Sequence, residues 1–236
     1  MVIRISSFII RASIFVILVA FIIMLFSGKR LCLLLAALLL SAAALAAADT
    51  AAARKTILVL GDSLSAGYGV DPDQAWPALL QKKIDAAGLK FKVLNAGVSG
   101  DTTADGLQRV DWLLRSKADV LLLELGANDG LRGMPVAATR TNLQAIMDRF
   151  RQKYPAIKLV IAGMKMPPNM GFEYVDAFNK IYPELAAKNH AALIPFLLEG
   201  VAGKPDLNLP DGIHPTPEGH KIVTENVWAV LRRTLP

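Results

Sequence analysis

The feature that most constrains the fold is a regular alternation of short apolar runs with amphipathic segments from residue 55 onward. Short aliphatic runs predict buried parallel strands, and apolar residues at helical spacing between them predict helices that cover the sheet. The predicted strands are Thr56–Leu60, Phe91–Leu94, Val120–Leu125, Lys158–Gly163 and Ala192–Pro195. This alternation is typical of an α/β fold built as a three-layer α/β/α sandwich around a parallel sheet.

Helices are expected over residues 76–87, 107–114, 135–153 and 174–185, and a last helix is expected to begin at Pro217. Thr216 directly precedes this last helix, where a hydroxyl can accept a free backbone N–H and where proline fits the next position. The sequence after the first 54 residues contains no internal repeat and no second change of pattern. We therefore predict one domain over residues 55–236.

Polar residues gather where three of the predicted strands end and directly before the last helix. The four segments are Gly61–Leu64 (GDSL), Asn95–Gly100 (NAGVSG), Gly126–Asp129 (GAND) and Asp211–Pro215 (DGIHP). Ligands of open parallel sheets bind outside the carboxyl ends of the strands, so these segments are expected to meet at one edge. That edge is the predicted functional site.

The residue types in these segments fit nucleophilic catalysis. A serine hydroxyl such as that of Ser63 attacks a carbonyl only when a base removes its proton, and histidine, whose ordinary pKa lies near neutrality, is the natural base. His214 is the candidate for this role. The base needs a partner that fixes its tautomer, and Asp211 lies three residues before His214 in a loop with glycine and proline. Ser63, His214 and Asp211 are therefore the candidate catalytic residues.

Attack on a carbonyl also creates an oxyanion, which needs hydrogen-bond donors already in place. The backbone N–H groups of Ser63 and Gly97 and the side-chain amide of Asn128 are the candidate donors. Gly97 has no side chain, and we expect this to leave its N–H open to a substrate oxygen.

Each segment taken alone has an ordinary explanation. Ser63 would serve as a turn residue or helix cap, Asn128 as part of a turn, and Asp211 with His214 as a surface pair. A phosphate-binding Walker loop is excluded because no Gly-Lys-Ser or Gly-Lys-Thr follows Gly61. The catalytic interpretation is preferred because all four segments occur together, in order, at predicted strand ends.

Residues 1–48 are predicted to be a hydrophobic leader rather than part of the fold. Residues 31–48 follow Lys29 and Arg30 and end in small residues, which predicts a signal peptide cleaved near Ala48. A second apolar stretch, residues 12–27, is explained either as an over-extended start, with the true start at Met24 after residues 1–23, or as a retained inner-membrane anchor. The prediction is export to the periplasm, with inner-membrane anchoring or secretion as alternatives.

The amino-acid composition argues against several other classes of function. The net charge is +6, but residues 1–48 hold four basic and no acidic residues, which leaves 22 basic against 20 acidic residues elsewhere. Such a balanced body does not favour a nucleic-acid partner. Cys32 is the one cysteine and there are three histidines, so a disulfide framework and a cysteine-based zinc site are excluded. We expect no metal and no cofactor.

The four segments together resemble the SGNH hydrolases, also called the GDSL lipase and esterase family. The matching positions are Ser63 in Gly61–Leu64, Gly97, Asn128 in Gly126–Asp129, and His214 in Asp211–Pro215. Further segments, GDSLSAGY, AWPALL, SGDT and ANDGLRG, are similar to the bacterial periplasmic subgroup of thioesterases, lysophospholipases and arylesterases. The resemblance extends from about Thr56 to the last helix.

This resemblance implies a flavodoxin-like, five-stranded parallel sheet and a serine hydrolase without a metal. It implies that Ser63 is the nucleophile, His214 the general base and acid, and Asp211 its orienting carboxylate, with Ser63, Gly97 and Asn128 as the oxyanion hole. Asp62 and Asp129 are implied to hold their loops. The implied substrates are acyl esters, thioesters and lysophospholipids, cleaved through an acyl-enzyme intermediate.

The segment after the fourth predicted strand, residues 164–172, bears on the substrate. Flexible thioethers adapt to irregular apolar ligands, so we expect an acyl-binding groove lined by Met164, Met166, Pro167, Met170 and Phe172. Ordinary packing beneath a long loop is the alternative. Two other functions also stay open: a carbohydrate O-acetylesterase, and a non-catalytic exported lipid-binding protein. Membrane contact is expected only through the leader, if it is retained.

Overall fold

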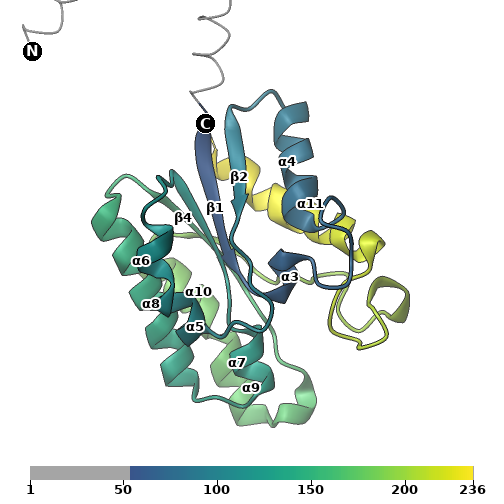
Figure 1. The fold of residues 1–236 in the computed structure, drawn as a ribbon. Helices are drawn as coiled ribbons and strands as arrows, with labels where there is room; N and C mark the ends of the chain where they lie inside the picture. Colours follow the sequence, from purple (N-terminus) through teal and green to yellow (C-terminus); the bar gives the residue numbers. More distant parts are fainter. Residues whose placement is uncertain (1–53, 236) are drawn as a thin grey trace, which may run out of the picture. The chain divides into compact units, whose positions relative to one another are not determined.

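The computed structural model describes residues 54–235. Within this part of the chain, strands and helices alternate almost throughout, as Figure 1 shows. The predicted leader, with its signal-peptide and anchor interpretations, lies outside the described residues. In chain order the elements are β1 (Lys55–Gly61), α3 (Ser63–Ala66), α4 (Trp76–Ala86), β2 (Phe91–Asn95), α5 (Thr103–Gln108), α6 (Val110–Leu113), β3 (Val120–Glu124), α7 (Ala127–Leu131), α8 (Val136–Lys153), β4 (Lys158–Ala162), the 3-10 turn η1 (Pro168–Met170), α9 (Phe172–Asn179), α10 (Ile181–Lys188), β5 (Ala192–Ile194), the 3-10 turn η2 (Pro205–Leu207) and α11 (Pro217–Thr234).

The five strands form one parallel sheet in the order β2-β1-β3-β4-β5. β3 lies at its centre with β1 beside it, and every residue of β3 is buried. Strands buried on both faces are expected to be aliphatic throughout, which is the composition that predicted them. The α/β fold with a five-stranded parallel sheet is thereby confirmed.

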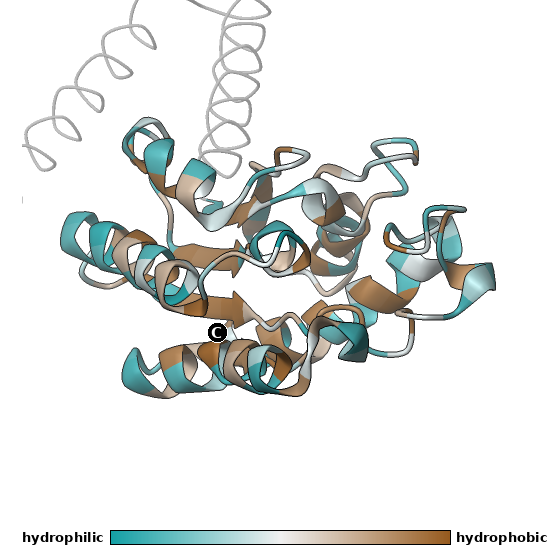
Figure 2. Cartoon of the chain, turned by 90° about the horizontal axis from the view of Figure 1, so that it is seen from below, coloured by the Kyte–Doolittle hydropathy of each residue, from teal (hydrophilic) through white to brown (hydrophobic). Residues whose placement is uncertain are grey.

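Helices cover both faces of the sheet and complete the three layers. In Figure 1, α4 and α11 lie on one side, and α5, α6, α8, α9 and α10 lie on the other. Figure 2 shows the apolar strands between these two layers, while the polar residues lie mainly on the outer helix surfaces. The chain passes from β1 to the edge strand β2 and then across the centre to β3, so the strand order reverses at β1. Ligands of this fold type bind outside the carboxyl ends beside such a reversal.

Two predicted helices are each divided in the structure. The helix expected over residues 174–185 is α9 followed by α10, and Pro183 explains the break. A proline ring clashes with the carbonyl four residues earlier, and that residue here is Asn179, the last of α9. The helix expected over residues 107–114 is likewise α5 and α6, which meet at Arg109. Two one-turn helices, α3 and α7, were not expected.

The last helix begins as predicted, because the Thr216 hydroxyl accepts the Gly219 N–H. Its histidine, His220, is buried against the start of α4 and accepts the Trp76 N–H at Nδ1, 3.3 Å away. Burial lowers the pKa of His220 to about 4, so the ring is neutral and serves as a packed acceptor. Across residues 54–235, no helix combines the length and the apolar character needed to cross a membrane.

Candidate active site

Ser63 lies in a tight turn where β1 passes into α3. Asp62 caps this short helix, since its Oδ1 accepts the Leu64 N–H at 3.0 Å. Ser63 is the first helical residue, so its own N–H has no acceptor within the helix and points out of the helix start. The residue is 9% exposed and lines a cavity, so its hydroxyl lies at a cavity wall rather than in bulk solvent.

His214 and Asp211 lie in the loop before α11, which local hydrogen bonds hold in shape. Asp211 Oδ1 accepts the N–H of Ile213 at 2.9 Å and that of His214 at 3.0 Å. The Leu209 N–H donates to the His214 carbonyl at 2.7 Å and closes the loop from the other side. The backbone N–H of His214, together with that of Ile213, lowers the pKa of Asp211 to about 2. Asp211 is therefore an anion at neutral pH.

These three side chains form a continuous hydrogen-bonded chain. His214 Nε2 lies 2.9 Å from Ser63 Oγ, and His214 Nδ1 lies 2.7 Å from Asp211 Oδ2. Because Asp211 is an anion that can only accept, Nδ1 of a neutral ring carries the proton and Nε2 is free to take one from Ser63. The Tyr68 ring packs against the His214 ring with centroids 4.5 Å apart, which restricts the position of the imidazole.

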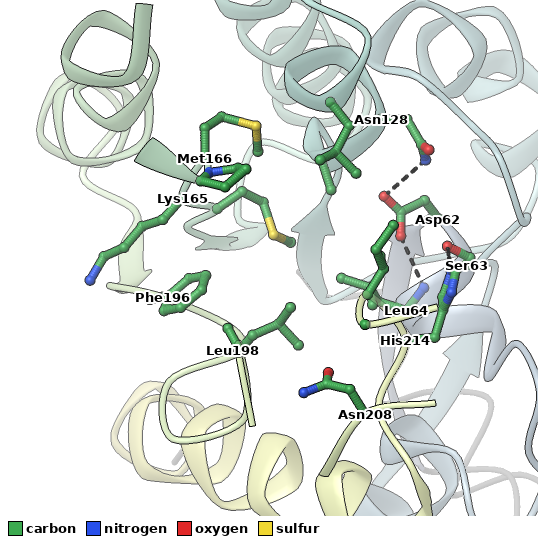
Figure 3. A pocket seen from close by; sticks show the side chains of 18 residues that line it. Asp62, Ser63, Leu64, Asn128, Lys165, Met166, Phe196, Leu198, Asn208 and His214 are labelled. Carbon is green, nitrogen blue, oxygen red and sulfur yellow. Dashed lines mark hydrogen bonds between the residues drawn. The ribbon is translucent and has the colours of Figure 1, made fainter. Parts of the chain in front are cut away.

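Asn128 reaches the same place from α7. Its Nδ2 donates to the Asp101 carbonyl at 2.9 Å and lies 3.4 Å from Asp62 Oδ2. The side-chain amide is thus directed toward the turn that carries Ser63, as Figure 3 shows. Asp129, the next residue, is buried and accepts both the N–H and the hydroxyl of Thr103, so it holds α7 against the start of α5.

The reason for a glycine at position 97 differs from the one expected. The Gly97 N–H is not open, because it donates to Asn95 Oδ1 at 3.0 Å. A Cβ at this position would lie 2.5 Å from the Ala66 nitrogen and 2.8 Å from the Ser65 carbonyl carbon. Glycine is therefore required by the close approach of two backbones. For Gly97 to donate to a substrate, its hydrogen bond to Asn95 must break or be shared.

A cavity of about 480 Å³ opens beside Ser63 and His214. Figure 3 shows Ser63, His214 and Asn128 on one side of it and Met166, Phe196 and Leu198 on the other. Most of its wall is apolar; the apolar side chains of residues other than alanine and proline are Leu64, Leu131, Met164, Met166, Phe196, Leu198 and Ile213. The site therefore combines a candidate nucleophile and base with a space suited to a hydrocarbon chain.

Only three of the five residues that were expected to line an acyl groove lie at the cavity. Met164, Met166 and Pro167 line this cavity, whereas Met170 and Phe172 do not. Phe172 is 85% exposed and lies over a separate shallow depression beside α9. The difference arises because the chain turns away after Pro167 into η1 and then into α9.

Sequence analysis missed Phe196 and Leu198, although both follow the last strand and so lie at the same edge of the sheet. It also missed Glu124, the last residue of β3, which is fully buried beneath the Ser63 turn. Its Oε2 accepts the Ser65 hydroxyl at 2.5 Å and the Asp62 N–H at 3.2 Å. The available signal was one acidic residue at the end of an otherwise aliphatic strand.

The two carboxyl groups beneath the Ser63 turn are hard to ionise together. Burial, followed by the negative charge of Asp62, raises the pKa of Glu124 well above its ordinary value. Burial also raises the pKa of Asp62, to about 6, against the opposing effect of its hydrogen bond from Leu64. We assign the neutral form at pH 7 to Glu124. Among the described residues, no group of three or more His, Cys, Asp and Glu side chains could hold a metal ion.

Comparison with known proteins places this geometry in a family. The model of the GDSL-like Lipase/Acylhydrolase family matches residues 59–222. The chain is 43% identical to "Esterase TesA" of Pseudomonas aeruginosa over 184 residues, which are 78% of this chain and 90% of that protein. It is 40% identical to "Thioesterase 1/protease 1/lysophospholipase L1" of Escherichia coli K12 over 174 residues, 73% of this chain and 81% of that protein.

A solved structure agrees with these sequence matches. The psychrotrophic esterase EstA from Pseudoalteromonas, inhibited by monoethylphosphonate, superimposes with a TM-score of 0.72 at 34% identity, covering 76% of this chain and 98% of that one. The family match spans the β1 end, the α7 turn and the loop before α11, which are the three segments that meet in the cavity. The chain therefore belongs to the GDSL-like Lipase/Acylhydrolase family.

Proposed function

We propose that this protein is a serine hydrolase that cleaves carboxylic esters and thioesters. The observation that carries the proposal is the hydrogen-bonded chain Ser63–His214–Asp211, with distances of 2.9 and 2.7 Å, at the wall of an apolar cavity. A serine bonded to a histidine that is itself oriented by a carboxylate is the arrangement that activates a hydroxyl for acyl transfer. A protein that only bound lipids would not need an activated nucleophile.

In the first half of the reaction, Ser63 Oγ attacks the carbonyl carbon while its proton passes to His214 Nε2. The carbonyl π electrons move to the oxygen, and the resulting imidazolium is stabilised by Asp211. The Asn128 amide and the Ser63 N–H stabilise the oxyanion. When the carbonyl re-forms, the bond to the alcohol or thiol leaving group breaks, and that group takes the proton from His214. The products are a free alcohol or thiol and an acyl ester on Ser63.

In the second half, water takes the place of the leaving group. His214 Nε2 removes a proton from water as the water oxygen attacks the acyl carbon. The intermediate collapses, the bond to Ser63 Oγ breaks, and the serine recovers its proton from His214. The carboxylic acid leaves and the enzyme returns to its starting state.

The apolar wall supports the choice of substrate class. Leu131, Met166 and Leu198 offer no hydrogen bonds, so they fit an alkyl chain better than a sugar. The names of the relatives, esterase and thioesterase/lysophospholipase, agree with acyl chains on alcohol and thiol leaving groups. We propose fatty acyl esters, acyl thioesters and lysophospholipids as substrates, and export to the periplasm on the evidence of the predicted signal peptide.

The test is an activity panel on the purified protein and on Ser63→Ala. The panel contains p-nitrophenyl esters from acetyl to palmitoyl, an acyl-CoA and a lysophospholipid. We expect hydrolysis of the longer acyl substrates and a loss of about 10⁴-fold or more in kcat for the variant. Activity confined to acetyl esters would favour the O-acetylesterase function, and a folded but inactive wild-type protein would favour lipid binding alone.

A further inference from the structure

Arg109, at the junction of α5 and α6, joins two segments that surround the site. Its Nε donates to Asp101 Oδ2 at 2.7 Å, and its Nη2 donates to the Gly61 carbonyl at 3.0 Å. The Arg109 and Asp101 side chains are only 20% and 11% exposed, so water screens this ion pair less than a surface pair. We call these two Arg109 contacts the clamp. Gly61 is the buried last residue of β1, an inner strand of the sheet, and this gives the clamp a rigid anchor.

The other end of the clamp controls the Asn128 side chain. The Asp101 carbonyl accepts one N–H of the Asn128 amide at 2.9 Å. A primary amide is planar, so fixing one N–H fixes the direction of the second. The same nitrogen also donates a longer hydrogen bond to Asp62 Oδ2 at 3.4 Å, and a substrate oxyanion must replace or share it. The position of Asp101 therefore decides where Asn128 aims its remaining donor.

Other hydrogen bonds also hold this loop. The Val98 N–H donates to the Gly61 carbonyl at 3.1 Å, and the Asp101 N–H donates to the Val98 carbonyl at 3.2 Å. These backbone bonds tie the loop to the end of β1, and the Thr102 N–H, which shares a peptide plane with the Asp101 carbonyl, donates to Asp105 Oδ2 at 2.9 Å. Arg109 adds the contact that joins the Asp101 side chain to β1. Loss of the Arg109 contacts is thus expected to loosen the loop rather than unfold it.

We propose that Arg109 is a positioning residue for the hydrolysis of esters and thioesters: it clamps Asp101 to the end of β1 and thereby aims the Asn128 amide at the oxyanion. This inference rests on the proposed function. The guanidinium is suited to the task because its donors point in fixed, divergent directions in one plane. A lysine ammonium has a single nitrogen, so it cannot reproduce the two separate donor atoms, Nε and Nη2, that these contacts use.

The first experiment compares Arg109→Lys, which keeps the charge, with Arg132→Lys as a matched control. Arg132 donates to the Gly100 carbonyl at 3.2 Å, so it touches the same loop from an exposed position. With a p-nitrophenyl ester, R109K is expected to lose about 10- to 100-fold in kcat while KM changes by about twofold or less. R132K is expected to keep the wild-type kcat and KM.

A double-mutant cycle with Asn128→Ala separates positioning from a merely structural role. If Arg109 acts through the Asn128 amide, R109K should lower kcat by no more than about twofold in the N128A background, because the group it positions is gone. Equal losses in both backgrounds would overturn the proposal, as would an R109K enzyme with wild-type kcat. Should R109K fail to fold, Asp101→Ala breaks the clamp from the other end, and the same cycle decides.

These experiments also distinguish a failure of the Arg109 proposal from a failure of the proposed function. Wild-type activity that Ser63→Ala abolishes supports the serine mechanism whatever R109K does. An inactive wild-type protein overturns the proposed function, whereas an active wild type with an unaffected R109K overturns only the role of Arg109.

Discussion

Two carboxyl groups flank the Ser63 turn, and their environments are opposite. Glu124 is fully buried beneath the turn, where desolvation raises its pKa well above the ordinary value. Asp211 lies in an exposed loop, where the backbone N–H groups of His214 and Ile213 lower its pKa to about 2. One acid is therefore held neutral and the other is held charged at the same pH.

The contrast separates what shapes the site from what reacts in it. Neutral Glu124 bonds to Ser65 and to the Asp62 N–H, and it contacts no atom that changes during hydrolysis. Charged Asp211 contacts His214, whose charge changes in each half of the proposed reaction. Replacing the first should change mainly folding stability, and replacing the second should change mainly rate.

The largest effect is expected for Asp211→Asn. The amide keeps an oxygen for the His214 and Ile213 N–H groups, but its NH₂ then faces His214 Nδ1. This arrangement favours the tautomer that carries its proton on Nε2, which cannot accept the Ser63 proton. We expect kcat to fall by about 10³- to 10⁴-fold, with a change in the free energy of unfolding of about 1 kcal/mol or less.

Steady-state kinetics and urea unfolding measure the two quantities. Asp206→Asn is the matched control, since Asp206 lies in η2 shortly before the same loop and its side chain makes no hydrogen bond within the described residues. Its kcat should equal that of the wild type. A D211N enzyme with near-normal kcat would contradict the claim that the charge of Asp211 is needed for the reaction.

The second largest effect is expected on the free energy of unfolding when Glu124 is replaced. Glu124→Ala leaves the Ser65 hydroxyl and the Asp62 N–H buried without their acceptor, at a cost of about 3 kcal/mol in the free energy of unfolding. Glu124→Gln keeps an acceptor oxygen without a charge, so the loss should be about 1 kcal/mol. The kcat of E124Q should stay close to that of the wild type, because the uncharged glutamine amide resembles the neutral carboxyl group of Glu124.

The pH dependence of E124Q tests the assigned charge. Above the ordinary Glu pKa of 4.5, the unfolded chain loses the Glu124 proton while the folded state keeps it, up to the raised pKa. The unfolded state then binds fewer protons, so this group makes stability fall as pH rises through that window. E124Q removes the effect, and its stability relative to wild type should increase from pH 4.5 to pH 8. A difference that decreases with pH would show that Glu124 is a stabilised anion.

Sequence reasoning brought the candidate residues together because parallel strands bring their carboxyl ends to one edge. GDSL, GAND and DGIHP each follow a strand or precede a helix at that edge, so local pattern alone predicted that Ser63, Asn128 and His214 would meet. The contacts of Glu124 were not predictable in this way. They depend on how deeply a side chain is buried and on which neighbour it reaches across the sheet. Gly97 shows the same limit, because its neighbour α3 was not expected.

The same reasoning explains the partial success with residues 164–172. A loop after a strand end was expected to face the site, but the point where it turns away depends on η1 and α9. Pro183 gave a readable signal for the end of α9, since proline excludes a continuous helix through Asn179. No comparable signal separated Met166 from Phe172.

The smallest effect is expected for Met166, which lines the cavity, in comparison with Phe172, which does not. Met166 is 7% exposed and lines the cavity, and a Cβ on Gly130 would lie 2.1 Å from its sulfur, so it packs tightly against α7. A carboxylate at this position would oppose an alkyl chain in the cavity far more than a two-carbon acyl group. For Met166→Asp, we expect the ratio of kcat/KM for the palmitoyl ester to that for the acetyl ester to fall about tenfold. Phe172→Asp, six residues further along and outside the cavity at the start of α9, should leave the ratio unchanged. Equal losses on both esters in M166D would instead mean that Met166 only supports α7.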